Sequence, residues 1–201
     1  MRHYTLPYSD EILALYSAGN DAQWKLLEQG KVQRSEIGYR RFDLLLTHLG
    51  SDLDREEVNH YYMERLSSFH FFLPGAEELL CALHGRYTLC LASNGTGWVQ
   101  EGRLKNSGIL PLLDRVFISE YLGANKPQLG FFDACFASLP GVKRSESLML
   151  GDSLTSDMLG GKIAGMHTCW YNPNRLPLPT DGTVEYQIHR LPDLLPLLEK
   201  L

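Results

Sequence analysis

The sequence lacks the features that would place the protein in a membrane or on a nucleic acid. None of its apolar runs approaches the ~20 residues that a membrane-spanning helix needs, and its first residues contain no apolar signal core. No basic run exceeds a pair such as Arg40-Arg41, and the formal net charge is -5. Surfaces that coat nucleic acid are basic. We therefore expect a cytoplasmic protein that acts on small molecules, with neither a membrane nor a nucleic-acid polymer as partner.

Cysteine is also scarce. The four cysteines stand singly in apolar neighbourhoods, without a C-x-x-C pair, and none of the seven histidines lies in an H-x-x-x-H arrangement. Structural zinc sites need clustered ligands of this kind. We therefore expect no zinc site and four buried free thiols, at Cys81, Cys90, Cys135 and Cys169.

The 201 residues, 44% of them hydrophobic, suffice for a core domain with a small accessory module. The pattern changes at Leu73-Pro74-Gly75. Before it, apolar residues recur at helical spacing within 12–27, 37–49 and 54–68, with Ser35 and Asp54 as expected helix caps. We predict a helical module over 1–72 and a separate core domain over 73–201.

In the core domain, short apolar runs alternate with amphipathic stretches. The runs at 87–92, 116–118, 147–150 and 167–171 are predicted strands, and the predicted helices are 76–84, 98–107, 128–138 and 156–164. Strands without in-out alternation, separated by helices, are typical of a parallel sheet covered on both faces. The prediction is a doubly wound α/β fold.

Polar loops follow the predicted strands, and ligands of open parallel sheets bind beyond the carboxyl ends of the strands. Ser93-Asn94-Gly95 follows the first strand and is suited to holding an anionic oxygen, although the same residues could form a simple turn. Lys126 precedes Pro127, which suits the first turn of the next helix. We expect the lysine charge to point into the crevice, against the plain alternative of a solvated side chain.

The third predicted strand leads into two aspartates. Asp152 follows the strand directly, where a buried carboxylate is costly unless a cation or several donors compensate. Asp157 could cap the following helix or reach back toward the same place. Carboxylate oxygens of this kind suit Mg²⁺, which is held by one or two carboxylates together with waters and phosphate.

Together and in this order, S-N-G at 93–95, K-P at 126–127 and G-D-S-x-x-S-D-x-x-G-G at 151–161 resemble three motifs of the haloacid dehalogenase-like (HAD) hydrolases. The helical module is similar to the cap inserted in subfamily I. Segments 118–123 and 168–172 are similar to the pyrimidine 5′-nucleotidase branch of that family. The resemblance implies a Mg²⁺-dependent phosphatase that hydrolyses a small phosphorylated substrate through an aspartyl-phosphate.

The resemblance also implies a role for each matching residue. Ser93 would hydrogen-bond the transferring phosphoryl group, and Lys126 would neutralise charge on the nucleophile and the phosphate. Asp152 would bind Mg²⁺, and Asp157 would support that site. The implied phosphate-binding residues are Ser93, Asn94, Gly95 and Lys126.

The first motif of the family has no counterpart in this sequence. It is D-x-D at the end of an apolar strand, where the first aspartate is the nucleophile. The only D-x-D spacing, Asp52-Leu53-Asp54, leads into a predicted helix, and we interpret it as a helix cap. Because that strand lies in the middle of the family's sheet, its absence predicts two neighbouring strands with unpaired backbone groups.

Three accounts of this gap stay open: an upstream segment is missing from the sequence, another copy of the chain fills the slot, or the sheet closes with altered pairing. We expect the chain as given to be inactive and to self-associate through the exposed edge. The alternative to a phosphatase is a non-catalytic phosphate- or nucleotide-binding pseudoenzyme or interaction protein. Nothing in the residues selects dehalogenation.

Overall fold

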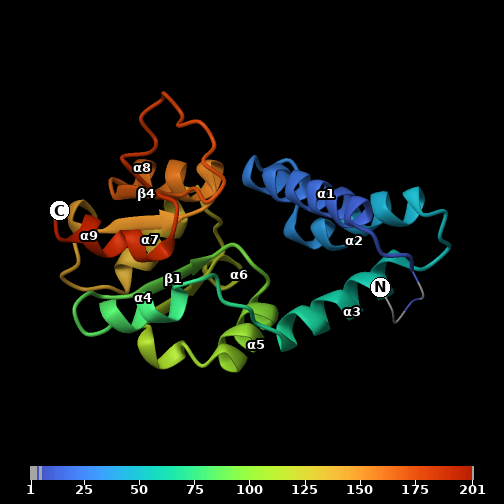
Figure 1. Cartoon of the computed structure of the whole chain (residues 1–201), viewed down its shortest axis with the longest axis horizontal. Helices are drawn as coiled ribbons and strands as arrows, with labels where there is room; N and C mark the ends of the chain where they lie inside the picture. The colour runs from blue at the N-terminus through green and yellow to red at the C-terminus, as the bar shows by residue number, and fades with distance from the viewer. Residues whose placement is uncertain (1–3, 5, 201) are drawn as a thin grey trace. The chain divides into compact units, whose positions relative to one another are not determined.

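The structure, a computed structural model, describes Tyr4 and residues 6–200. The chain divides into two compact units, Met1–Arg65 and Leu66–Leu201 (Figure 1). The domain boundary that the sequence predicts, between residues 72 and 73, stays a prediction. Within the part of the chain that is described, no helix combines the length and the apolar character that crossing a membrane would require.

Within the described residues, the first unit consists of α1 (Asp10–Glu28), α2 (Arg34–His48) and most of α3 (Arg55–Ser68). α1 and α2 pack against one another, and their apolar faces bury two small clusters. The first centres on Phe42, Leu45, Leu46 and Val58, and the second on Leu27, Val32 and Ile37. This arrangement follows from the helical spacing of the apolar residues.

The helix starts are set by local hydrogen bonds, and one expected cap is wrong. Ser35 lies inside the first turn of α2, which begins one residue earlier and is closed by a capping box in which Glu36 Oε2 accepts from Gln33 N at 2.8 Å. Asp54 Oδ1 accepts from the backbone N–H groups of Glu56 and Glu57 at 2.8 and 2.9 Å. Asp54 therefore caps α3, which confirms the interpretation of the single D-x-D spacing.

The second unit contains five parallel strands in two sheets. β1 (Cys90–Ser93) pairs with β2 (Arg115–Ile118), and β3 (Leu148–Gly151) pairs with β4 (His167–Tyr171), which pairs with β5 (Tyr186–Ile188). The helices are α4 (Ala76–Leu83), α5 (Gly97–Ser107), α6 (Ser119–Leu122), α7 (Leu129–Ala137), α8 (Leu159–Ala164) and α9 (Leu194–Leu198), with a π-helical turn at Leu154–Met158. The parallel α/β fold is confirmed.

Both faces of the strands are buried, as expected for a doubly wound sheet. Met149 and Trp170 pack on one face with Phe117, Phe131, Phe132 and Met158. Cys169 and its neighbours in β3 pack on the other face against α4 and the C-terminal segment, in a cluster that includes Leu79, Leu83, Ile188 and Leu194. Successive side chains of a strand point to opposite faces, so consecutive apolar residues supply both layers.

The two sheets are not joined by backbone pairing. Among the described residues, β1 is hydrogen-bonded only to β2, and β3 only to β4. β1 and β3 are therefore edge strands, each with one side that no strand pairs with. The sequence predicts this arrangement for a sheet that lacks its middle strand.

The expectation of four buried thiols is wrong for two of them. Cys135 and Cys169 are buried, whereas Cys81 and Cys90 are exposed. Cys81 lies on α4 between Leu79 and Leu83, whose side chains face the core, so the cysteine faces away. An apolar sequence neighbourhood predicts burial only when the helix or strand period places the residue inward.

The two classes of thiol are expected to differ in reactivity. Burial raises the pKa of Cys169 to about 11 and that of Cys135 to about 12, so neither forms an appreciable amount of the reactive thiolate near neutral pH. An aromatic disulfide reagent at about pH 8 should modify Cys81 and, more slowly, Cys90 in the native chain, because desolvation also raises the pKa of Cys90, and all four cysteines after unfolding. Peptide mapping by mass spectrometry checks this, and rapid native modification of Cys169 would contradict it.

Candidate active site

Ser93, the last residue of β1, presents a hydroxyl whose acceptor positions are already used. Ser93 Oγ accepts from Gly95 N at 3.0 Å and from Gln100 Nε2 at 2.6 Å. The hydroxyl hydrogen is therefore directed elsewhere and can donate to a ligand oxygen. Gly95 is required here, because a Cβ at this position would lie 2.8 Å from Gln100 Cγ.

Asn94 holds the K-P turn in place. Its Nδ2 donates to the backbone oxygen of Lys126 at 2.9 Å, and its Oδ1 accepts from the backbone N–H of Lys126, also at 2.9 Å. This two-point contact links residues 32 positions apart and fixes the backbone of the lysine relative to β1. Asn94 thus positions Lys126, a role that is more indirect than the phosphate contact implied by the resemblance.

Lys126 lies inside the protein and not in solvent. It is 6% exposed, and its Nζ donates to the Ala92 carbonyl oxygen at 2.7 Å and to Asp157 Oδ1 at 2.7 Å. An ammonium group has three donors, so one N–H remains for a further acceptor. Because Ala92 is in β1 and Asp157 follows β3, this one side chain connects the ends of the two sheets.

Asp157 reaches back to the site and does not cap the helix. Its Oδ2 accepts from Ser153 N at 3.1 Å, while its Oδ1 accepts from Lys126. The helical segment is capped by Ser153, whose Oγ accepts from Ser156 N at 3.1 Å. Of the two roles expected for Asp157, helix cap or a side chain that reaches back toward the site, the structure shows the latter. The carboxylate lies so close to Gly151 that no side chain fits there.

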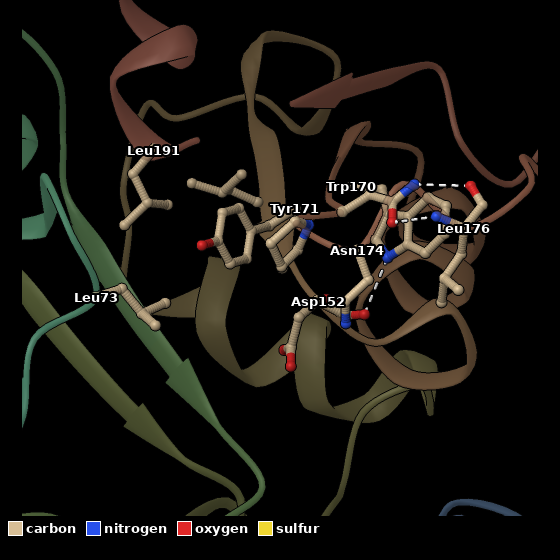
Figure 2. Close-up of a pocket in the computed structure, with 11 residues that line it drawn as sticks. Leu73, Asp152, Trp170, Tyr171, Asn174, Leu176 and Leu191 are labelled. Atoms are coloured by element: carbon tan, nitrogen blue, oxygen red, sulfur yellow. Dashed lines mark hydrogen bonds between the residues drawn. The ribbon is translucent and has the colours of Figure 1, made fainter. Parts of the chain in front are cut away.

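Asp152 lies in a different environment. Its side chain is exposed and forms no hydrogen bond within the described part of the chain, while its backbone oxygen accepts from Trp170 Nε1 at 3.0 Å. Asp152 lines a pocket of about 590 Å³ together with the apolar side chains of Leu73, Leu150, Tyr171 and Leu191. Figure 2 shows its carboxylate pointing away from the Trp170 indole at the edge of this pocket.

The carboxylates of this region fit a Mg²⁺ ion that is held by a single protein ligand. Asp152 offers an unengaged carboxylate, whereas both oxygens of Asp157 are held by Lys126 and Ser153. Among the residues that the structure describes, no three acidic, histidine or cysteine side chains gather as a ready-made metal cage. Mg²⁺ keeps several waters and typically takes one or two carboxylates plus substrate phosphate. Asp152 is thus the residue that would hold the ion. Asp157 would act indirectly, by fixing the position of Lys126.

Hydrogen bonds bring together Asn94, Lys126 and Asp157 among the sequence-predicted residues, whereas the Asp152 side chain takes no part in them. The structure also adds groups that the sequence did not indicate. Gln100 orients Ser93, the Trp170 indole fixes the backbone of Asp152, and Glu120 accepts from Gly97 N at 2.5 Å beside the same loop. Gln100 follows Ser93 by seven residues and lies on a helix, and no spacing rule marks it as a partner.

A sequence model of the haloacid dehalogenase-like hydrolases matches residues 5–165. The chain therefore belongs to this family of hydrolases, as the motifs and the parallel α/β core predict.

Individual relatives agree with this assignment. The chain is 38% identical over 186 residues to pyrimidine 5′-nucleotidase PynA of Streptococcus pneumoniae, covering 92% of this chain and 78% of that protein. It is 29% identical over 197 residues to pyrimidine 5′-nucleotidase YjjG of Escherichia coli, covering 98% and 87%. The crystal structure of the HAD-hydrolase YfnB of Bacillus subtilis, described as bound to magnesium, superposes with a TM-score of 0.92 at 32% identity, covering 98% of this chain and 86% of that chain.

Proposed function

We propose that the protein is a Mg²⁺-dependent phosphomonoesterase whose substrate is a nucleoside 5′-monophosphate. The observation that carries the proposal is the buried Lys126, which bridges the Ala92 carbonyl and Asp157 with a third N–H to spare. Ser93 is the last residue of β1, next to Ala92, and Asp152 directly follows β3. A hydroxyl donor, a fixed cation and a free carboxylate at one sheet edge are what binding a phosphate with a magnesium ion requires.

Each residue has a definite task in this proposal. The Ser93 hydroxyl donates to a phosphoryl oxygen, and Gln100 keeps its oxygen oriented. The Lys126 ammonium offsets the negative charge that gathers on the phosphoryl group and its attacking oxygen. Asp152 holds the magnesium ion, which supplies further charge neutralisation when bound. Asp157 Oδ1 accepts from the Lys126 ammonium group and so holds it in position.

The attacking group is the part that these residues do not provide. The family's reaction begins when a carboxylate oxygen attacks phosphorus and the alcohol leaves. The 201 residues contain no D-x-D at a strand end, and Asp157 is already engaged by Lys126 and Ser153. We therefore propose that the chain as given binds substrate and magnesium without turning substrate over. A natural pseudoenzyme with the same binding site is the second candidate.

The test compares two forms of the chain. Uridine 5′-monophosphate with Mg²⁺ should bind to the 201-residue chain in a calorimetric titration, without release of phosphate. A form extended upstream by an apolar strand that ends in D-x-D should release phosphate in a Mg²⁺-dependent manner. A well-folded extended form that stays inactive would overturn the phosphatase and leave the pseudoenzyme.

The metal role is tested by neutralising one carboxylate. Asp152→Asn should weaken Mg²⁺ binding by at least about tenfold, because a charged ligand is lost from a hard cation. Glu199→Gln removes the same charge at an exposed position near the C-terminus and should leave binding unchanged. Equal binding by both variants would show that Asp152 does not hold the metal.

A further inference from the structure

The peptide group that follows Asp152 has both of its polar atoms held by side chains. The Asp152 carbonyl oxygen accepts from Trp170 Nε1 at 3.0 Å. The N–H of the same peptide group belongs to Ser153 and donates to Asp157 Oδ2 at 3.1 Å. Because the C=O and N–H of a trans peptide point in opposite directions, the indole and the carboxylate clamp this group from two sides.

The indole is itself held in place by the core. Trp170 lies on β4, in register with Gly151 of β3, the residue just before Asp152. It is 3% exposed, and it packs in the same cluster as Met149 and Met158. Protein interiors are close-packed, so a buried ring of this size has little freedom to turn. The direction of the indole N–H is therefore set by β4 and its neighbours.

Packing alone does not call for a tryptophan at position 170. Phe131 and Phe132 fill the same cluster with rings that carry no polar atom. A buried indole N–H needs an acceptor, since leaving it without one costs about 1–3 kcal/mol. The acceptor at this place is the backbone oxygen of Asp152, so the one polar atom of the ring is directed at the proposed metal ligand.

The clamp holds the backbone of Asp152 and leaves its carboxylate free. The carboxylate forms no hydrogen bond within the described part of the chain, and Figure 2 shows it pointing away from the indole. An aspartate side chain has only two torsion angles, so a fixed backbone restricts its oxygens to a few positions. Residues that orient a metal ligand in this way contribute to metal affinity without touching the metal.

We propose that Trp170 is a positioning residue for magnesium, because its indole N–H holds the Asp152 backbone and so sets where the Asp152 carboxylate meets the ion. The inference rests on the metal role proposed above for Asp152 and adds the group that orients it. Asp157 holds the other side of the same peptide group and also the Lys126 ammonium group. The backbone of the metal ligand and the buried cation are thus tied to one carboxylate.

The first test follows the indole directly. Mg²⁺ is titrated into the ¹⁵N-labelled 201-residue chain, and the indole N–H resonances of its three tryptophans are recorded. Trp170→Phe lacks one of these resonances and thereby assigns the Trp170 signal. We expect Mg²⁺ to shift this signal in a saturable manner and to leave that of Trp24, on α1, unchanged. An unshifted Trp170 signal at saturating Mg²⁺ would overturn the proposal.

The second test measures Mg²⁺ affinity by calorimetry. Trp170→Phe keeps an aromatic ring but loses the donor, and it should weaken Mg²⁺ binding by about tenfold. Phe132→Leu is the matched control, since it reduces packing in the same cluster and removes no hydrogen bond, so it should leave the affinity unchanged. In an Asp152→Asn background, Trp170→Phe should cause no further loss of affinity, because the ligand that it positions is already altered.

The outcomes separate this proposal from the proposed function. If Asp152→Asn weakens Mg²⁺ binding and Trp170→Phe does not, positioning by Trp170 is wrong and the metal role of Asp152 stands. If neither variant changes the affinity, both are wrong. An equal loss in Phe132→Leu and Trp170→Phe would assign the effect to packing and refute the role of the indole N–H. Circular dichroism identifies a variant that fails to fold, and the indole shift in the parent chain then decides.

Discussion

Replacing Lys126 by methionine is expected to lower the free energy of unfolding of the second unit by about 3–5 kcal/mol, because it leaves a buried carboxylate without its cation. The Lys126 and Asp157 side chains are each 7% exposed, and Lys126 Nζ lies 2.7 Å from Asp157 Oδ1. Every other ion pair among the described residues is more exposed to solvent. The substitution also removes the donor to the Ala92 carbonyl. Urea unfolding followed by circular dichroism measures the loss.

The two partners should not contribute additively. The double variant Lys126→Met, Asp157→Leu removes both charges, so it should be less destabilised than the sum of the two single variants. Lys143→Met is the matched control. Its pair with Glu146 is shorter, at 2.6 Å, but the two side chains are 70% and 61% exposed. An exposed pair contributes about 0–1 kcal/mol, so a comparable loss in both lysine variants would refute the argument from burial.

The sequence could predict the order of elements and the rim where the polar loops meet. Short continuous apolar runs located β1 to β4, and apolar residues at helical spacing located most of the helices. Ser93 ends β1, Asp152 follows β3, and Lys126 comes after β2 and the short helix α6; parallel strands bring their carboxyl ends to one edge. β5 was missed because three residues contain too little pattern to distinguish a strand from a turn.

The contacts between loops could not be predicted in the same way. That Asn94 clamps the Lys126 backbone, that Gln100 orients Ser93 and that Ser153 replaces Asp157 as the helix cap all depend on tertiary distances. Spacing along the chain says nothing about such distances. The same limit applies to Arg41: its position in an amphipathic helix is ordinary, and only the structure shows that it is buried without an ion pair among the described residues.

Gly151→Ala is expected to destabilise the second unit by about 3 kcal/mol, the upper end for overpacking a tight site. A Cβ on this residue would overlap the Asp157 carboxylate and its Cβ, which are fixed on the other side by Lys126 and by Ser153 N. To make room, Asp157 must leave the ion pair or β3 must shift. We expect the variant to lose both stability and phosphate binding, measured by urea unfolding and by calorimetry.

Two comparisons decide whether the overlap with Asp157 causes the loss of stability in Gly151→Ala. Gly130→Ala, within α7, is the control. A Cβ at this position would have one neighbour, Ala124 Cβ at 3.8 Å, which is an ordinary contact distance. The change should therefore stabilise α7 by about 0.5–1 kcal/mol. In an Asp157→Ala background, the carboxylate is gone and Gly151→Ala should cost much less than in the parent chain. An unchanged cost in that background would place the steric conflict elsewhere. Because glycine at 151 lets the Asp157 carboxylate approach the strand, the conformation of β3 and the position of the Lys126 ammonium group depend on the same missing side chain.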